Sequence, residues 1–233
     1  MIEAEWWEYD SLGELADAVA GDVGFIIESA VDARGSSLIA VPGGKTGPAI
    51  FPKLIAQTVP WKKVTVIPTD DRLVPMDDER SNIRAIGKAF LPTGARVIPI
   101  ATDISDYRLA GNSADARLQD FPWPPDLVWL GMGIDGHTAS IFTGPDFQEA
   151  LDAPKARRAI GVMPDPLPAE SPVARVTLTR ASILAARTVM ITITGDEKRQ
   201  VLEQAIADGQ SSRLPIGRVL AEAEQPIDIH WAR

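Results

Sequence analysis

The segment from Leu130 to Phe142 carries the most specific chemical pattern in the chain. Its three glycines place Asp135 and His137 two residues apart. A nearby carboxylate can hold an imidazole in one tautomer, and such a histidine can act as a general base near neutral pH. A lone histidine is more often structural, and we interpret His230, near the C-terminus, in that way. The glycines are a costly backbone choice for a merely structural turn, so the segment predicts a catalytic pair.

A second polar group follows the apolar run at 63–67, where Asp70, Asp71 and Arg72 stand together. Adjacent carboxylates suit contacts with sugar hydroxyls or general-base work. Arg72 can hold one of the two carboxylates in a charge-assisted pair. The alternative is a solvated loop with a helix cap, which we prefer for the acidic residues at 77–79.

A glycine-rich segment follows the apolar run at 37–41, in the order Gly43, Gly44, Lys45, Thr46. Between a strand and a helix, glycines let backbone N–H groups approach an anion, and the helix N-terminus adds a favourable potential. The spacing is not that of a Walker nucleotide loop, which ends in Gly-Lys-Ser/Thr. Taken alone, the segment predicts a tight turn as readily as an anion site.

Two cations, Arg175 and Lys198, stand where a predicted strand meets a loop or a helix. A lysine at a helix start is ordinarily a solvated side chain. A cation in the first helical turn opposes the helix dipole unless an anion is near. These two positions therefore favour ligands of a phosphate group.

The elements that must position these residues alternate between short apolar runs and helical stretches. Strands are predicted at 37–41, 63–67, 96–100, 126–130, 175–178, 189–193 and 227–230, and helices at 48–57, 81–90, 113–118, 180–186 and 197–207. Ser11 and Glu14 have capping-box spacing, ahead of one broken or two short helices around Gly21 and Gly24. A further helix is expected to begin near His137.

This alternation predicts an α/β fold with a three-layer, mostly parallel sheet flanked by helices, in one domain over residues 1–233. In such sheets, ligands bind beyond the carboxyl ends of the strands. Three of the loops that leave the predicted strands carry the polar groups described above, so we expect one shared site.

Composition limits the partners of the chain. Its net charge of −9 argues against a nucleic-acid or anionic-membrane surface, although a few local cations can still bind an anionic small molecule. It has no cysteine and only two histidines, which argues against thiolate and multi-histidine metal sites and fits a reducing cytoplasm. No apolar run approaches the ~20 residues of a membrane span, and the acidic N-terminus is unlike a signal peptide.

Together these segments resemble the 6-phosphogluconolactonase family, which is related to glucosamine-6-phosphate deaminase. The resemblance extends from Gly43 to Lys198 and is carried mainly by the segments at 131–142, 175–179 and 194–198. The Thr-Ala-Ser run after His137 and the Arg-Leu-Val-Pro run at 72–75 favour the lactonase. Lys45 stands where the family usually has Ser, and Asp71 stands where it usually has Glu.

The resemblance implies hydrolysis of 6-phospho-D-glucono-1,5-lactone, in the oxidative pentose phosphate pathway, without an organic cofactor or metal. His137 would activate the water that attacks C1, and Asp135 would orient His137 or the sugar. Arg72 or backbone N–H groups would stabilise the oxyanion, with Asp70 completing the catalytic group. The expected substrate-binding residues are Gly43, Gly44, Lys45, Thr46, Asp71, Arg175 and Lys198.

Three alternatives stay open. A 6-phosphohexosamine deaminase or isomerase would use the same Asp and His. A non-catalytic sugar-phosphate sensor is a second possibility, although such sensors usually carry an added DNA-binding domain for which this chain leaves no room. A lactonase for unphosphorylated substrates is the third, and it would leave Arg175 and Lys198 without a role.

Overall fold

The centre of the molecule is a seven-stranded sheet in which every neighbouring pair of strands is parallel. The computed structural model describes residues 2–233. In spatial order, the strands are β1 (Ala4–Tyr9), β10 (Ile227–Ala232), β9 (Thr188–Thr194), β6 (Leu127–Leu130), β2 (Ser37–Val41), β3 (Val64–Pro68) and β5 (Arg96–Val97).

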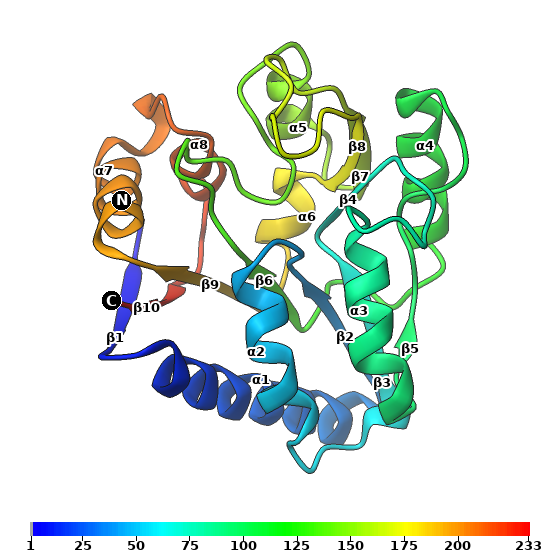
Figure 1. Cartoon of the computed structure of the whole chain (residues 1–233), viewed down its shortest axis with the longest axis vertical. Helices are drawn as coiled ribbons and strands as arrows, with labels where there is room; N and C mark the ends of the chain where they lie inside the picture. The colour runs from blue at the N-terminus through cyan, green and yellow to red at the C-terminus, as the bar shows by residue number, and fades with distance from the viewer. Residues whose placement is uncertain (1) are drawn as a thin grey trace.

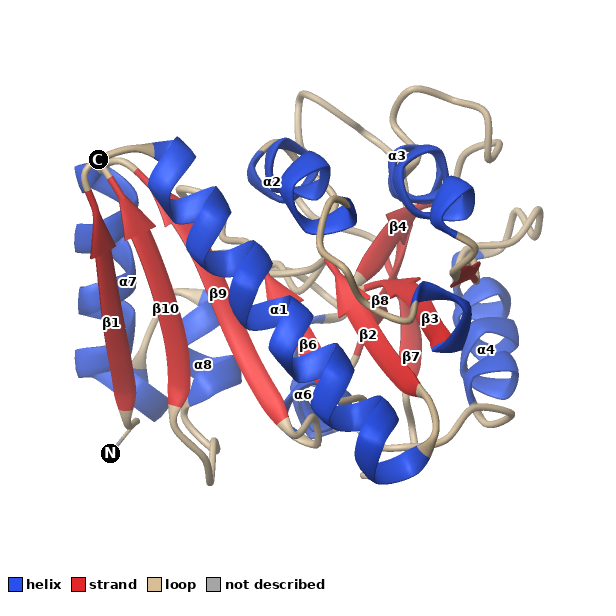
Figure 2. Ribbon diagram, turned by 90° about the horizontal axis from the view of Figure 1, so that it is seen from below, coloured by secondary structure: helices blue, strands red, loops and turns tan. Residues whose placement is uncertain are grey.

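Helices cover both faces of this sheet. One face packs against α1 (Leu12–Arg34), α2 (Thr46–Ile55) and α3 (Asn82–Phe90). The other packs against α4 (Tyr107–Leu118), α5 (Phe147–Asp152), α6 (Arg180–Leu184), α7 (Asp196–Asp208) and α8 (Pro215–Leu220). Figure 1 shows the helices on the two sides of the sheet, and Figure 2 shows α1 crossing one face of it. The predicted three-layer α/β fold is confirmed.

The side chains of β2 show how the layers are built. Leu38 and Ala40 belong to one hydrophobic cluster, while Ile39 and Val41 belong to the cluster on the opposite face. Successive side chains of a strand point to opposite faces, so a strand covered on both faces is apolar throughout. Within residues 2–233, no helix is long and apolar enough to cross a membrane.

The first helix is longer than the sequence predicts. Ser11 caps α1 by accepting a hydrogen bond from the Glu14 N–H at 3.2 Å, as expected. The predicted break at Gly21 and Gly24 is wrong, because α1 runs unbroken to Arg34. A helical glycine costs only about 1 kcal/mol relative to alanine, and nine buried residues along α1 outweigh that cost.

A second, smaller sheet was not predicted. It contains β4 (Asp70–Arg72), β8 (Arg175–Leu178) and β7 (Ala159–Val162), paired antiparallel in that order. The polar triplet of β4 has no apolar pattern from which a strand could be recognised. Its pairing with β8 places Arg72 directly opposite Arg175, so two arginines distant in sequence become neighbours.

The helix expected near His137 is also wrong. Residues 133–137 form a tight turn, closed by hydrogen bonds from the Gly136 N–H to the Gly133 carbonyl and from the Gly133 N–H to the His137 carbonyl. Gly136 and Ala139 have φ angles of 77° and 48°, in the left-handed region that a right-handed helix cannot contain. The next helix, α5, begins only at Phe147.

His230 lies in the interior of the sheet, as the sequence predicts. Its ring stacks on Tyr9, and the Tyr9 hydroxyl lies 3.0 Å from its Nδ1. Burial lowers the pKa of His230 to about 4. The Asp22 carboxylate lies 3.7 Å from Nε2 and would favour the charged ring, but burial is the dominant effect.

This lowered pKa predicts a loss of stability in acid. The unfolded chain binds a proton at this histidine below about pH 6.5, whereas the folded chain binds it only near pH 4. The contribution is therefore present above pH 6.5 and lost as pH falls through 4. Between neutral pH and about pH 4, the unfolding free energy of the wild type should fall by about 3 kcal/mol more than that of His230→Asn. Denaturant titrations across this range measure the difference, and parallel curves for the two proteins would contradict it.

Candidate functional site

The site lies where four neighbouring strands end. β9, β6, β2 and β3 are adjacent and parallel, so their carboxyl ends share one edge of the sheet. The segments that follow them contain the predicted residues at 195–198, 131–142, 42–46 and 69–72. The sheet topology therefore brings together segments that are far apart in sequence.

Asp135 and His137 form a close polar pair at this edge. The Nδ1 atom of His137 lies 2.5 Å from Oδ1 of Asp135. Burial opposes ionisation of Asp135, but the hydrogen bond and charge of His137 outweigh it and lower the pKa of this carboxyl group. A proton on Nδ1 would be donated to this carboxylate, which leaves Nε2 as the ring nitrogen open to a ligand.

Glycine 133 makes this pair possible. A Cβ atom on Gly133 would lie 2.2 Å from the His137 ring and 2.6 Å from the Asp135 carboxylate. A contact under 3 Å cannot be accommodated without moving the ring, so the turn has room for the pair only because residue 133 lacks a side chain. The turn thus fixes the imidazole through a hydrogen bond on one side and close backbone on the other.

Asp70 joins two of the loops. Its carboxylate is buried and accepts hydrogen bonds from the hydroxyls of Ser140, at 2.5 Å, and Thr69, at 3.1 Å. The Ser140 N–H in turn donates to the Thr177 hydroxyl on β8, at 3.2 Å. The segment that carries His137 is thereby tied to the segment after β3 and to the small sheet.

The Asp71 carboxylate is bonded to the start of α3. Only 1% of its surface is exposed. It accepts hydrogen bonds from the backbone N–H groups of Arg72, Asn82 and Ile83 and from the Ser81 hydroxyl. Burial raises its pKa to about 6, against the lowering effect of the backbone donors. Its carboxylate therefore holds the start of α3, and its predicted contact with the substrate stays a prediction.

Arg72 is held by an amide instead of the carboxylate that we expected. Its Nη1 donates to Oδ1 of Asn82 at 2.7 Å and to the Arg80 carbonyl at 2.8 Å. Its Nε is buried and has no hydrogen-bond partner in the described part of the chain. Asn82 was not among the predicted site residues. The Asn82 amide leaves no room for a side chain at position 43, because a Cβ atom on Gly43 would lie 1.9 Å from the Asn82 Oδ1.

Arg175 is deeply buried for a charged residue, with 4% of its surface exposed. Its Nη2 donates to the Ser171 carbonyl at 3.3 Å, and its Nε finds no partner within residues 2–233. Burial lowers its pKa, while the nearby charge of Asp70 opposes that shift. Its guanidinium carbon lies 4.9 Å from the centre of the Phe142 ring. A buried donor without a partner costs about 1–3 kcal/mol, which is consistent with a partner supplied by a ligand.

Lys45 and Lys198 form a second cationic group. Lys198 lies in the first turn of α7, and its pKa is lowered by burial and by the charge of Lys45. Lys45 precedes α2, which begins at Thr46 without a side-chain cap among the described residues. The Lys45 side chain is 93% exposed and lies 3.9 Å from Glu170. The charge of Lys45 thus acts on Lys198, whereas the charges that act most on Arg175 are those of Asp70 and Arg72.

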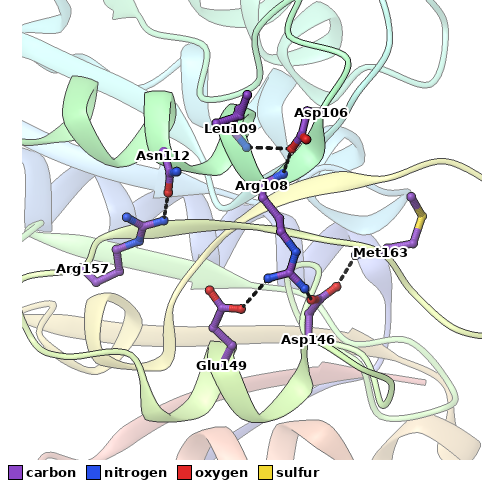
Figure 3. A network of polar contacts seen from close by, with 8 residues as sticks. All are labelled: Asp106, Arg108, Leu109, Asn112, Asp146, Glu149, Arg157 and Met163. Atoms are coloured by element: carbon purple, nitrogen blue, oxygen red, sulfur yellow. Dashed lines mark hydrogen bonds and ion pairs between the residues drawn. The ribbon is translucent and has the colours of Figure 1, made fainter.

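A salt-bridge network connects α4 to α5 and to the residue that precedes α5. Arg108 of α4 donates to Asp146 at 2.9 Å and to Glu149 at 3.2 Å, as Figure 3 shows. Buried Asp146 also accepts a hydrogen bond from the Met163 N–H at 2.8 Å. Asp146 therefore ties together the segment that follows Phe142 and the segment that follows β7. Across residues 2–233, the structure has no cluster of three His, Cys, Asp or Glu side chains placed to hold a metal ion.

The comparisons with known proteins agree on one family. Residues 10–231 match the model of the family described as glucosamine-6-phosphate isomerases/6-phosphogluconolactonase. A 6-phosphogluconolactonase of Rhizobium meliloti (strain 1021) is 37% identical over 228 residues, which cover 96% of this chain and 97% of that protein. One of Mesorhizobium japonicum is 37% identical over 233 residues, covering 97% and 94% of the two chains.

The solved structures give the same result. The crystal structure of a 6-phosphogluconolactonase from Shewanella baltica OS155 superposes with a TM-score of 0.91 at 29% identity, covering 99% of this chain and 98% of that one. The matches extend over nearly the whole chain and include all four segments of the site. The chain therefore belongs to the family of glucosamine-6-phosphate isomerases and 6-phosphogluconolactonases.

Proposed function

We propose that this chain hydrolyses 6-phospho-D-glucono-1,5-lactone to 6-phospho-D-gluconate. The observation that carries the proposal is the Asp135–His137 hydrogen bond at 2.5 Å, on a turn that has room for it only because residue 133 is glycine. The pair presents one basic nitrogen at the edge of the sheet where sugar phosphates are expected to bind. The relatives named 6-phosphogluconolactonase support lactone hydrolysis over the isomerase branch of the family.

In the proposed reaction, His137 acts as the general base. Its Nε2 takes a proton from a water molecule while the water oxygen attacks C1 of the lactone. The carboxylate of Asp135 stabilises the imidazolium that forms. When the tetrahedral intermediate collapses, the bond from C1 to the ring oxygen breaks, and the ring oxygen receives the proton from His137. The product is the open-chain acid, and His137 returns to its neutral form.

Arg72 is the proposed stabiliser of the oxyanion. Asn82 holds its guanidinium in place, and its buried Nε is a donor without a partner in residues 2–233. A fixed donor aimed at developing charge contributes most when it need not reorganise during the reaction. Asp70, bound to Ser140, would keep the segment after β3 aligned with the segment that carries His137.

The phosphate of the substrate would bind at the start of α2. The segment from Gly43 to Thr46 offers backbone N–H groups at an uncapped helix N-terminus, which favours an anion. Lys45 and Lys198 add positive charge there, and a bound dianion would relieve the repulsion between them. Arg175 would contact the sugar phosphate from the other side, near Arg72. We also propose a cytoplasmic location, which suits a chain without cysteine.

The first prediction concerns the reaction. The purified chain should open freshly generated 6-phosphogluconolactone and release no ammonia from glucosamine 6-phosphate, because the relatives that it matches are named 6-phosphogluconolactonase. A coupled assay with the spontaneous hydrolysis rate subtracted measures the first activity, and an ammonia assay measures the second. Ammonia release as fast as lactone opening would assign the chain to the deaminase branch instead.

The second prediction concerns the base. His137→Asn should lower turnover on the order of 10²- to 10⁴-fold, the usual contribution of a general base. Gly133→Ala should also lower turnover strongly, since its Cβ would displace the imidazole. The matched controls are His230→Asn and Gly131→Ala, whose Cβ would meet nothing within 4 Å. If Gly133→Ala and Gly131→Ala have equal turnover, the backbone does not position the base.

The third prediction concerns the phosphate. Arg175→Ala and Lys198→Ala should raise KM more than they lower kcat, because the phosphate contacts persist from the ground state to the transition state. A hydrogen bond to a charged group contributes about 1.5–3 kcal/mol, so KM should rise roughly 10- to 150-fold. Lys45→Ser should be mild. Thermal melts with 6-phosphogluconate are the control: a variant that melts early but keeps the wild-type ligand-induced shift has lost a structural contact, not a phosphate contact.

A further inference from the structure

One aromatic ring, that of Phe142, contacts two groups of the proposed site and has no part in the reaction described above. The His137 ring stacks on it, with 4.1 Å between ring centroids and 20° between the ring planes. The guanidinium carbon of Arg175 lies over the same ring, 4.9 Å from its centroid. The proposed base and a proposed phosphate ligand therefore share one aromatic neighbour.

The stacking supplies an orientation that the Asp135 hydrogen bond cannot. A hydrogen bond at Nδ1 fixes one atom of the imidazole, but the ring plane can still turn about that bond. A parallel aromatic ring at 4.1 Å fixes the plane and hence the direction in which the Nε2 lone pair points. Proton transfer depends steeply on such alignment.

The same ring also supports the guanidinium. Arg175 is buried, yet its only side-chain hydrogen bond within residues 2–233 is a long one to Ser171, and its Nε has no partner there. Contact with the negative face of an aromatic ring partly replaces the water that a buried guanidinium has lost. Phe142 is thus a principal contact that sets where this cation lies.

The position of Phe142 is itself fixed at both ends. Two residues before it, Ser140 bonds to Asp70, and four residues after it, Asp146 bonds to Arg108 and Met163. Figure 3 shows the second of these anchors. A ring mounted between two buried anchors can act as a rigid spacer.

We propose that Phe142 is a positioning residue that holds the imidazole of His137 and the guanidinium of Arg175 at a fixed separation. The spacing lets one lactone molecule meet the phosphate ligand and the base at the same time. This inference rests on the proposed lactonase function, which it deepens. It assigns to Phe142 an effect on both kcat, through His137, and KM, through Arg175.

The test compares Phe142→Leu with Phe142→Tyr and with Phe121→Leu. Phe121→Leu is the matched control, because the guanidinium of Arg96 lies 5.1 Å from its ring, as Arg175 does for Phe142, but it contacts no imidazole in the described structure. We expect Phe142→Leu to lower kcat on the order of tenfold and to raise KM, because misalignment is costly. Phe142→Tyr keeps the ring and should restore most of both, and Phe121→Leu should change neither.

Double mutants separate positioning from general damage. If Phe142 acts through His137, adding Phe142→Leu to His137→Asn should change the residual kcat by less than about twofold. If it also acts through Arg175, adding it to Arg175→Ala should leave KM within about the same range. Full additive losses in both backgrounds would overturn the proposal.

A spectroscopic readout keeps this test distinct from the test of the proposed function. The chain has two histidines, so the His230→Asn variant assigns the His137 imidazole protons by elimination. Stacking on Phe142 should shift these protons upfield in the wild type and in Phe142→Tyr, and Phe142→Leu should lose the shift. A wild type without lactonase activity would refute the proposed function alone. Imidazole protons that are unchanged by Phe142→Leu would refute the positioning role, whatever the activity.

Discussion

The parallel pairing of β9, β6, β2 and β3 is the constraint on which the site depends. Each of these strands is largely buried on both faces, and its charged neighbours in sequence lie beyond its ends. Parallel pairing then gathers the four carboxyl ends at one edge, where residues from 42–46 to 195–198 become neighbours. The contacts between loops, such as Ser140 with Asp70 and Gly43 with Asn82, are possible because the sheet has already brought those loops together.

Buried hydrogen bonds hold several of the polar side chains at this edge in place. The Asp71 carboxylate accepts a hydrogen bond from the start of α3, and the Asn82 amide oxygen binds Arg72. The Asp70 carboxylate joins two loops through Ser140. The groups that we propose for ligand binding are Nε2 of His137, the donors of Arg72 and Arg175, and the lysine pair beside α2. This distribution places positive charge around a single base, which is the balance that an anionic sugar ester requires.

The sequence was informative where chemistry and periodicity coincide. The apolar runs predicted the central strands within about two residues, except that 96–100 shortened to Arg96–Val97 and that β1 was not predicted. The glycine pattern singled out Asp135 and His137. The sequence did not predict the features that depend on contacts between distant segments. The strand β4 is a polar triplet defined only by its partner β8, and Asn82 matters only because Gly43 packs on it. The turn at 133–137 was predicted as a helix start. The left-handed backbone conformation of Ala139 breaks that helix, and an alanine, unlike a glycine, gives no sign of this conformation in the sequence.

The central claim is that the Asp135–His137 pair and the cations at the strand ends act on opposite ends of one substrate. A crystal structure of the chain with 6-phosphogluconate bound tests it most directly. We expect the phosphate against the segment from Gly43 to Thr46 and near Lys198, with the C1 carboxylate within about 3.2 Å of His137 Nε2. A phosphate bound at His137, or a ligand that leaves His137 without contact, would contradict the account.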